Sequence, residues 1–368
     1  MARIAISLSG EGRGHATRAA AMLERLAGDH EVRVYAPTET LPYLRRVAEG
    51  LPGRVDVHAI TGLVVRSAGR RPDLLETISA GCDYHARTLG PLVERLIGEL
   101  DDFGADLGIV DCEPALPRAC ARLGVPVASV DHRHFLLAYD LGGLPGWLRW
   151  RAWMMGHAVA ACTIGATDTV VSAFFRPPLR PGWEHVVQVG TLVRREIREA
   201  VPEDRGFLVS RLRPHTPFAT LAALADCGLP VRVYGLGARD PLGPLGFHDD
   251  EGGRFVEDLV GCRAVVAAAG SQLVGEALHL GKPVLALPEA ARPEQRMSAW
   301  FLAAMGCGES CPLEQASVER VAAFVAGLDG FARAAARLRG RIDGTGDVSR
   351  VIGHRLAAAG TAAVQPSS

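Results

Sequence analysis

This sequence lacks excess charge, paired cysteines and long apolar runs, and each shortage excludes a class of protein. Its 40 lysine and arginine residues nearly balance 41 aspartate and glutamate residues, which leaves a net charge of -1 and no electrostatic reason to expect a nucleic-acid partner. No stretch approaches the roughly 18 uninterrupted apolar residues that a membrane-spanning helix needs, and the first apolar run, Ile4–Leu8, is too short for a secretory signal. We therefore expect a cytoplasmic protein without a transmembrane segment.

Metal-binding patterns are missing as well. None of the eight cysteines forms a Cys-x-x-Cys pair, and the closest two, Cys307 and Cys311, have no second pair or nearby histidines to complete a zinc site. No Asp-x-Asp motif stands at an expected strand end, since Asp101-Asp102 and Asp249-Asp250 are adjacent pairs in expected loops. We predict neither a metal site nor a bound cofactor.

What the sequence contains is a regular alternation of short apolar runs and helical patterns. Apolar, β-branched runs without polar alternation are typical of parallel sheets that helices cover on both faces. The expected strands are Arg3–Ser9, His30–Ala36, Val55–Ile60, Leu107–Val110, Pro126–Val130, Gly206–Ser210, Pro230–Tyr234, Ala264–Ala268 and Pro283–Leu287. The expected helices include Arg13–Ala27, Thr38–Glu49, Thr216–Cys227, Gly253–Leu259, Gln272–Leu280 and Arg296–Met305.

The alternation restarts after residue 190, following a stretch from Phe175 to Gly190 that is rich in proline. Because 368 residues exceed what one hydrophobic core normally serves, we predict two Rossmann-like domains of the α/β class with a hinge between them. Their expected bounds are residues 1–183 and 190–335. Residues 336–368 are expected to form closing helices and a frayed tail.

A glycine-rich turn, Gly10-Glu11-Gly12-Arg13-Gly14-His15, follows the first expected strand. Glycines at this position allow backbone amides to approach a phosphate at a helix N-terminus, so Gly12 and Gly14 are candidate ligand-binding residues. A dinucleotide fold would need a third glycine where His15 stands, and a P-loop would need a following Gly-Lys-Ser/Thr. Neither pattern is present, and an imidazole instead stands at the start of the helix.

A second glycine turn follows the strand Ala264–Ala268 and opens a helix. Backbone amides at Gly270, Ser271 and Gln272 are placed to meet a diphosphate. Glu276, about a turn and a half along the helix, is a natural acceptor for ribose hydroxyls. Further candidates for donor binding come from the ends of neighbouring strands, where open α/β sheets bind ligands; they are Ser210, Glu294 and Gln295.

At this point the segment from about residue 248 to 308 resembles the donor-binding segment of GT-B glycosyltransferases, including the UDP-glycosyltransferases and MurG-type N-acetylglucosaminyltransferases. The residues that hold the family spacing are Gly270, Glu276, Gly281, Pro283, Pro288, Glu294 and Gln295. The first loop with His15, and the segments Asp111-Cys112-Glu113-Pro114 and Asp131-His132-Arg133-His134, resemble a glycosyltransferase-like subgroup of the same superfamily.

The resemblance implies a GT-B fold, in which two Rossmann-like domains face each other across a cleft. The N-terminal domain would bind the acceptor, a small molecule or a lipid-linked compound, and the C-terminal domain a nucleotide-sugar donor, expected to be a UDP-sugar. We expect a metal-independent, inverting transfer with His15 as the base and Asp111 as the carboxylate that orients it. Asp131 and His134 are the rival catalytic pair.

Two other functions stay open. An isomerase of the UDP-N-acetylglucosamine 2-epimerase type shares this architecture and would use several acids, for which Asp111, Glu113 and Asp131 are available. The second alternative function is binding of a nucleotide-sugar without turnover, because Ala268 and Ala269 stand where relatives more often have histidine and glycine.

Three tryptophans recur at a spacing of three. Trp147, Trp150 and Trp153 alternate with Arg149 and Arg151, a pattern compatible with a helix that skims a membrane or with an aromatic wall around an acceptor. The same spacing is typical of core packing. The sequence favours the core or the acceptor wall over the membrane.

Overall fold

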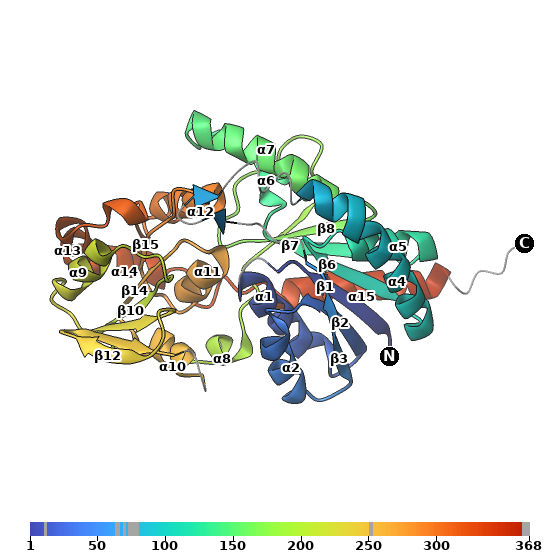
Figure 1. Cartoon of the computed structure of the whole chain (residues 1–368), viewed down its shortest axis with the longest axis horizontal. Coiled ribbons are helices and arrows are strands. Elements are labelled where there is room, and N and C mark those ends of the chain that lie inside the picture. Colours follow the sequence, from blue (N-terminus) through green and yellow to red (C-terminus); the bar gives the residue numbers. More distant parts are fainter. Residues whose placement is uncertain (11–12, 63–66, 69–70, 73–80, 250–252, 363–368) are drawn as a thin grey trace, which may run out of the picture. The chain divides into compact units, whose positions relative to one another are not determined.

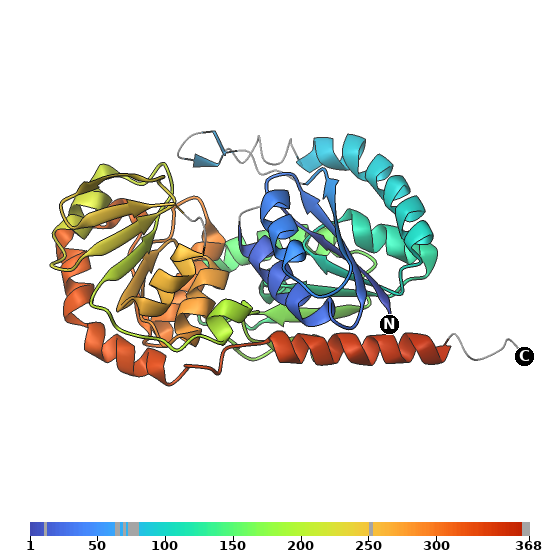
Figure 2. The ribbon, with the colours of Figure 1, turned by 90° about the horizontal axis from the view of Figure 1, so that it is seen from below.

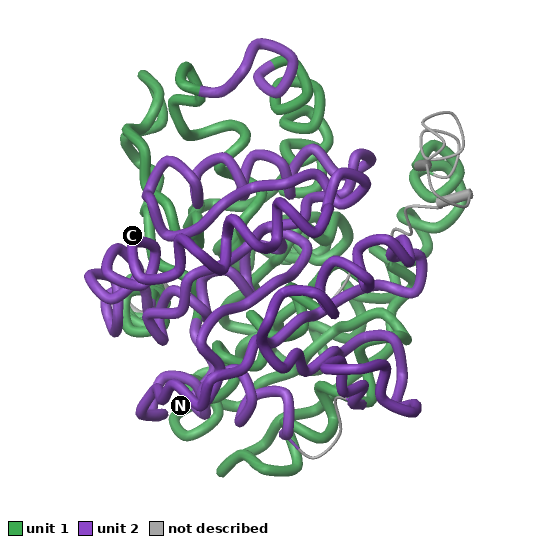
Figure 3. Tube along the Cα trace, turned by 90° about the vertical axis from the view of Figure 1, so that its left-hand side faces the viewer, with its two compact units in different colours: residues 1–143, 150–192, 344–368 green, residues 144–149, 193–343 purple. Residues whose placement is uncertain are grey.

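The protein forms two compact units, coloured green and purple in Figure 3. The structure is a computed structural model that describes residues 1–10, 13–62, 67–68, 71–72, 81–249 and 253–362. The first unit comprises residues 1–143, 150–192 and 344–368, and the second comprises residues 144–149 and 193–343. The chain passes from the first unit to the second just after the proline-rich stretch that ends at Gly190.

The first unit is built on a seven-stranded sheet with the order β3-β2-β1-β6-β7-β8-β9, in which all neighbouring strands are parallel (Figure 1). Its strands are β1 (Arg3–Leu8), β2 (Glu31–Pro37), β3 (Val55–Ile60), β6 (Leu107–Asp111), β7 (Val127–Asp131), β8 (Asp168–Ser172) and β9 (Val187–Val189). A separate short hairpin pairs β4 (Ser67–Ala68) with β5 (Arg71–Pro72).

Helices cover both faces of this sheet. They are α1 (Arg13–Leu26), α2 (Leu41–Glu49), the π-helical turn η1 (Tyr84–Thr88), α4 (Leu89–Phe103), α5 (Ala115–Leu123), α6 (Phe135–Ala138), α7 (Gly146–Cys162) and α15 (Thr345–Ala362). Because successive side chains of a strand point to opposite faces, Ile4 and Ile6 pack with α1, α2 and α15, whereas Ala5 packs with α4 and α5. The C-terminal helix α15 therefore completes the core of the first unit (Figure 2).

The second unit repeats the plan with the strand order β12-β13-β11-β10-β14-β15-β16. Every neighbouring pair is parallel except β12 with β13. The strands are β10 (Leu208–Arg211), β11 (Val231–Tyr234), β12 (Arg239–Leu242), β13 (Leu245–His248), β14 (Ala264–Ala267), β15 (Val284–Ala286) and β16 (Gly308–Ser310). The helices are α8 (Arg195–Arg198), α9 (Phe218–Ala225), α10 (Arg254–Gly261), α11 (Ser271–His279), α12 (Pro293–Ala304), the 3-10 turn η2 (Leu313–Gln315), α13 (Val318–Ala326) and α14 (Leu328–Ala336).

Each sheet has a switch point where the chain reverses its direction of winding. In the first unit it lies between β1 and β6, and in the second between β10 and β14. Ligands of open α/β sheets bind beyond the carboxyl ends of the strands at such points. The two glycine turns follow β1 and β14, so each stands at the switch point of its own unit.

The fold class expected from the sequence is confirmed, and the predicted strands recur with shifts of one or two residues at their ends. Helices α4 and α5 and the strands β8, β9, β12, β13 and β16 are not among the predicted elements. Glu294 and Gln295, predicted to precede the helix Arg296–Met305, instead lie in the first turn of α12, because Pro293 begins that helix earlier than expected.

The sequence favours the core or an acceptor wall for the tryptophans of α7; core packing is wrong, and the acceptor wall stays a prediction. Trp147, Trp150 and Trp153 are 50%, 54% and 62% exposed. The reason is the stripe that α7 buries, which consists of Leu148, Ala152, Gly156 and Val159 and lies on a different side of the helix. The first turn of α7, up to Arg149, groups with the second unit and the remainder with the first.

Lys282, the only lysine of the sequence, stabilises the second unit from inside. It is 5% exposed, and its ammonium donates hydrogen bonds to the carbonyl oxygens of Glu203 and Cys262, the latter at 2.6 Å. Burial lowers its pKa. The residue before it, Gly281, has a φ of +72°, which a glycine adopts without strain where α11 turns into β15.

We predict that Lys282→Met lowers the free energy of unfolding by about 2–4 kcal/mol, because two buried carbonyls lose a charged donor. Urea titration followed by circular dichroism measures the loss. Arg263→Met, at an arginine whose side chain is 48% exposed and pairs with Asp204, is the control and is expected to change stability by less than about 1 kcal/mol. A change in Lys282→Met no larger than the control would contradict the prediction.

Candidate active site

His15 and Asp111 meet at the switch point of the first unit. Asp111 is the last residue of β6, and His15 lies in the first turn of α1, which follows the neighbouring strand β1. The Nδ1 atom of His15 is 2.9 Å from the Oδ1 atom of Asp111, and the two residues are 5% and 0% exposed. Two of the predicted catalytic residues are therefore in direct contact.

Arg18 is a third member of this cluster. Its Nε atom donates to Oδ2 of Asp111 at 2.9 Å and its Nη2 atom to Oδ1 at 3.2 Å, and Nη2 also lies 3.2 Å from Nδ1 of His15. Sequence reasoning missed Arg18. The available signal was its spacing, because residues three apart on a helix share a face and Arg18 follows His15 by three.

The charges of this cluster decide where its protons lie. Burial raises the pKa of Asp111, but the Arg18 guanidinium and His15 more than offset this effect, so the net shift is downward. Because an ionised carboxylate only accepts hydrogen bonds, Nδ1 of His15 carries the proton between the two residues. This leaves Nε2 as the basic nitrogen, and no side chain in the described part of the chain hydrogen-bonds to it.

Asp131 and His134 also form a pair, but every atom of that pair is engaged. The carboxylate of Asp131 accepts from Nδ1 of His134 at 2.5 Å, from the His134 backbone N–H at 2.8 Å and from the Ser129 hydroxyl at 2.6 Å. On the other side of the ring, Nε2 of His134 is 3.2 Å from Oγ1 of Thr163. Thr163 in turn donates its single proton to the carbonyl of Val159, so its oxygen is left to accept a proton from the ring.

This geometry holds His134 as an imidazolium. Burial lowers the pKa of His134, but the Asp131 carboxylate offsets the loss and raises the pKa above 6.5 overall. Burial likewise raises the pKa of Asp131, and His134 then lowers it far below its usual range. The pair therefore suits the anchoring of the loop after β7 better than it suits proton abstraction.

The segment between β6 and α5 is strained and capped. Cys112 has a φ of 54°, and it is the single non-glycine residue with positive φ among the residues that the structure describes. Glu113 accepts hydrogen bonds from the backbone N–H groups of Ala115 and Leu116, at 2.7 and 2.9 Å, and so caps α5. Its pKa is raised by burial. Asp111 is thus held at the strand end by the turn that follows it.

In the second unit, Gly270 is the N-cap of α11 and is exposed to solvent. No side chain caps this end of the helix, and the Gly270 carbonyl accepts the first helical hydrogen bond, from the Val274 N–H at 3.1 Å. A Cβ atom added at Gly270 would meet nothing within 4 Å. Ser271 and Gln272 form the first turn and are each 8% exposed. The predicted diphosphate site therefore lies at a helix N-terminus that has no side-chain cap.

Glu276 is not the free acceptor that the sequence predicts. It is 1% exposed, and Arg194 donates two hydrogen bonds to its carboxylate, from Nε at 2.9 Å and from Nη2 at 2.8 Å. The Nε2 atom of Gln272 adds a third, at 3.2 Å. Burial of a carboxylate requires such partners. Sequence reasoning missed Arg194, which precedes α8 and lies far from α11 in the sequence.

The remaining candidates occupy different surroundings. Gln295 accepts a hydrogen bond from the Glu289 N–H at 3.0 Å and so braces the loop between β15 and α12, while Glu294 is half-buried beside it. Ser210 lies within β10, is fully buried, and its hydroxyl has no hydrogen-bond partner among the described residues. Gly14 is half-buried at the start of α1, and Gly12 lies outside the described residues.

A cluster around Glu289 was also missed. Its carboxylate pairs with Arg213 at 2.9 Å, with His215 at 3.1 Å and with Arg292 at 3.6 Å. The pKa of Arg213 is lowered by burial and by the neighbouring Arg292. The cluster joins the loop after β10 to the loop after β15, beside the helix that carries Glu294 and Gln295. In the described ranges, no three histidine, cysteine, aspartate or glutamate side chains gather as a metal site.

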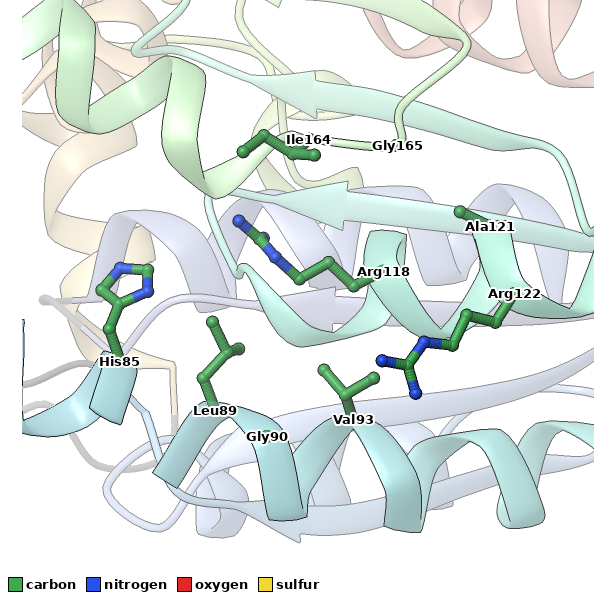
Figure 4. Close-up of a pocket in the computed structure, with 9 residues that line it drawn as sticks. All are labelled: His85, Leu89, Gly90, Val93, Arg118, Ala121, Arg122, Ile164 and Gly165. Carbon is green, nitrogen blue, oxygen red and sulfur yellow. The ribbon is translucent and has the colours of Figure 1, made fainter. Parts of the chain in front are cut away.

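A separate cavity of about 390 Å³ in the first unit lies between α4 and α5 (Figure 4). Leu89 and Val93 of α4 face Arg118 and Arg122 of α5 across it. Both arginines are already engaged, Arg118 with the carbonyls of Pro114 and Ala161 and Arg122 with Glu94. Neither arginine is therefore free to bind an anionic ligand in the cavity.

Two Rossmann-like units, each with a glycine turn at its switch point, are typical of the GT-B class of proteins. The chain matches the family described as glycosyl transferase family 1 over residues 2–329, and it belongs to this family. The protein is accordingly a glycosyltransferase. No curated protein matches the sequence.

Solved structures share the fold at low sequence identity. A UDP-glucosyltransferase from Polygonum tinctorium that glucosylates indoxyl superposes with a TM-score of 0.70 at 14% identity, covering 97% of this chain and 99% of that one. Phytolacca americana UGT2, complexed with UDP-2fluoro-glucose and pterostilbene, gives the same TM-score, identity and coverage. The calicheamicin glycosyltransferase CalG4 has a TM-score of 0.64 and 16% identity over 100% of both chains. These likenesses confirm the GT-B fold.

The Asp131–His134 pair yields a prediction of pH-dependent stability. A histidine whose folded-state pKa is raised stabilises the fold fully below its unfolded value of about 6.5, and this contribution is lost as pH rises through the folded-state pKa. The destabilisation caused by His134→Gln is therefore expected to be largest below about pH 6 and to shrink as the pH rises. Urea titrations across this range, with the exposed His354→Gln as control, measure the trend. A loss that is the same at every pH would exclude the ion pair.

Proposed function

We propose that this glycosyltransferase moves a sugar from a UDP-sugar donor to a hydroxyl-bearing acceptor, without a metal ion and with inversion, using His15 as the base. The observation that carries the proposal is the buried His15–Asp111 pair at the switch point of the first unit. Its Nδ1 faces a carboxylate, and its Nε2 has no protein partner in the described chain. That arrangement is the one a general base requires.

The reaction follows from this geometry as a single displacement. Nε2 of His15 takes the proton of the acceptor hydroxyl as the acceptor oxygen bonds to the anomeric carbon. The bond from that carbon to the diphosphate oxygen breaks, and the electron pair leaves with the nucleoside diphosphate. Asp111 stabilises the imidazolium that forms, and Arg18 keeps Asp111 ionised and in place. Attack opposite the leaving group inverts the anomeric centre.

The donor belongs to the second unit in this proposal. The diphosphate rests at the N-terminus of α11, where the amides of Ser271 and Gln272 and the helix dipole offset the charge of the leaving group. These amides supply the neutralisation that a metal provides in other transferases. Support for UDP comes from the two plant enzymes above, whose descriptions name UDP-glucose chemistry. Glu294 and Gln295 are the candidates for the sugar hydroxyls.

Glu276 remains the proposed ribose ligand, with Arg194 in a supporting role. A carboxylate has about four acceptor positions, and the bidentate contact with Arg194 uses two of them. Arg194 thereby fixes the plane of the carboxylate, and the ribose hydroxyls donate to the positions that remain once the donor displaces Gln272. Gly12, Gly14 and Ser210 stay candidates for contacts near the phosphates.

The acidic residues that an isomerase would need are engaged by other groups of the protein. Asp111 is bound by Arg18 and His15, Glu113 caps α5, and Asp131 holds His134. Incubation with a panel of UDP-sugars and acceptors, followed by mass spectrometry, decides between the functions. Free UDP with an acceptor of increased mass identifies a transferase, an isomeric sugar nucleotide without UDP identifies an isomerase, and an unchanged donor identifies a binding protein.

We predict that His15→Ala lowers kcat by about 10²–10⁴-fold, since general-base catalysis contributes that much, while the affinity for UDP stays unchanged. Turnover is measured by UDP release, and affinity by titration calorimetry. His354→Ala, at an exposed histidine of α15, is the matched control and is expected to retain full activity. Normal turnover in His15→Ala would remove His15 from the mechanism.

We predict that Glu276→Gln weakens UDP binding by about tenfold or more, because a charge-assisted hydrogen bond to ribose is lost in a side chain of the same shape. Glu257→Gln, at an exposed glutamate of α10, is the control. Calorimetry that gives Glu276→Gln and the parent protein equal affinities would end the assignment of the ribose site. Circular dichroism distinguishes lost binding from lost structure.

A further inference from the structure

The outer face of α7 is an exposed aromatic surface. We define the α7 face as Trp147, Trp150, Trp153, Arg149 and Arg151. Its three tryptophans are half or more exposed, and they are the exposed ones among the tryptophans that the structure describes. α7 is the long green helix at the upper edge of Figure 1. Indole rings left in water at three positions of one helix require an explanation, since exposed apolar patches mark interaction sites.

The helix geometry separates a buried stripe from the α7 face. At about 100° per residue, Leu148, Ala152 and Val159 fall on one side, and Trp150 falls on the opposite side. Trp147 and Trp153 lie within roughly 60° of Trp150, one on either side of it. The tryptophans therefore form one continuous strip on the side of the helix opposite the buried stripe, and at one end of it the Arg296 guanidinium lies 5.3 Å from the centre of the Trp147 ring.

Cations lie along both edges of this strip. By the same turn of about 100° per residue, Arg149 lies beyond Trp153 and Arg151 lies beyond Trp147. The guanidinium of Arg151 is 5.4 Å from the centre of the Trp150 ring, so charge and ring belong to one surface. From Leu141 to Thr167 the sequence contains no aspartate or glutamate. The arginines are therefore not offset by any acidic residue of their own segment.

We propose that the α7 face lies on the surface of an anionic lipid bilayer, parallel to the membrane plane. Tryptophan favours the boundary between hydrocarbon and water, because its ring is apolar and its N–H is polar. Arginines at the edges of an aromatic strip reach the negatively charged headgroups and add electrostatic attraction. None of the described helices has the length and apolar character needed to cross a membrane, so α7 docks at the surface without spanning it.

The charge pattern favours a bilayer over a second copy of the chain. A symmetric dimer through the α7 face would bring Arg149 and Arg151 of both copies together, and no acidic residue of this segment could offset the repulsion. An anionic bilayer instead presents negative charge over its whole surface. The complementary partner of an aromatic helix face that carries arginines and no acidic residue is therefore a layer of acidic lipids.

The experiment is co-flotation of the full-length protein with vesicles of phosphatidylglycerol and phosphatidylcholine, compared with vesicles of phosphatidylcholine alone. We expect binding to the mixed vesicles, with a blue shift of tryptophan fluorescence. Trp150→Ser combined with Trp153→Ser is expected to weaken binding by more than about tenfold, because the apolar area that enters the bilayer is removed. Phe218→Ser, at an exposed aromatic of α9, is the matched control and is expected to bind like the parent.

Substitution of the arginines tests whether they contribute electrostatic attraction to the anionic headgroups. Arg149→Gln and Arg151→Gln are each expected to weaken binding to mixed vesicles by about fivefold at low salt. Arg54→Gln, whose side chain is 74% exposed, is the control. Equal binding to both vesicle types would overturn the anionic partner, and absence of binding to either would overturn the proposal. Self-association that the double tryptophan variant abolishes, without vesicle binding, would assign the α7 face to a second copy and also overturn it.

Discussion

A buried carboxylate at the end of β6 is the constraint on which the first unit depends. Asp111 is inaccessible to water, and an isolated charge in that position would cost far more free energy than a domain can spare. The chain meets this cost by directing Arg18 and His15 of α1 at the two oxygens. The same contacts fix the tautomer of His15 and join the helix after β1 to the neighbouring strand at its carboxyl end, so stability and reactivity share one set of atoms.

The second unit also contains a buried carboxylate that is paired with an arginine. Glu276 is almost wholly buried within α11, and Arg194 covers it with a bidentate contact. In both units an arginine that holds a buried acid adjoins the switch point of a parallel sheet. An arginine suits this role because its fork matches the two carboxylate oxygens and because it stays protonated at any physiological pH.

The two arginines also mark the limit of what the sequence could predict. Apolar runs such as Ile4–Leu8 predict buried strands because burial on both faces dictates their composition, and glycine turns predict ligand sites because few other residues fit there. Arg194 and Glu276, in contrast, are far apart in the chain, and only tertiary folding brings them together. The predicted burial of the α7 tryptophans was wrong for a related reason. A spacing of three is compatible with either side of a helix, and small residues such as Ala152 and Gly156 determine which side is buried. The edge strands β9, β12 and β16 have three or four residues each, too few to show a pattern of their own.

The solitary lysine of the second unit has a practical consequence. Reagents that acylate amines find one side-chain target in this sequence, and that target lies inside a folded unit with its ammonium held by two carbonyls. The rate at which Lys282 becomes labelled therefore reports how often the second unit opens, because no surface lysine competes for the reagent. Immobilisation or crosslinking through amines would leave the folded body of the enzyme almost untouched, whereas chemistry directed at guanidinium groups would strike it at many points.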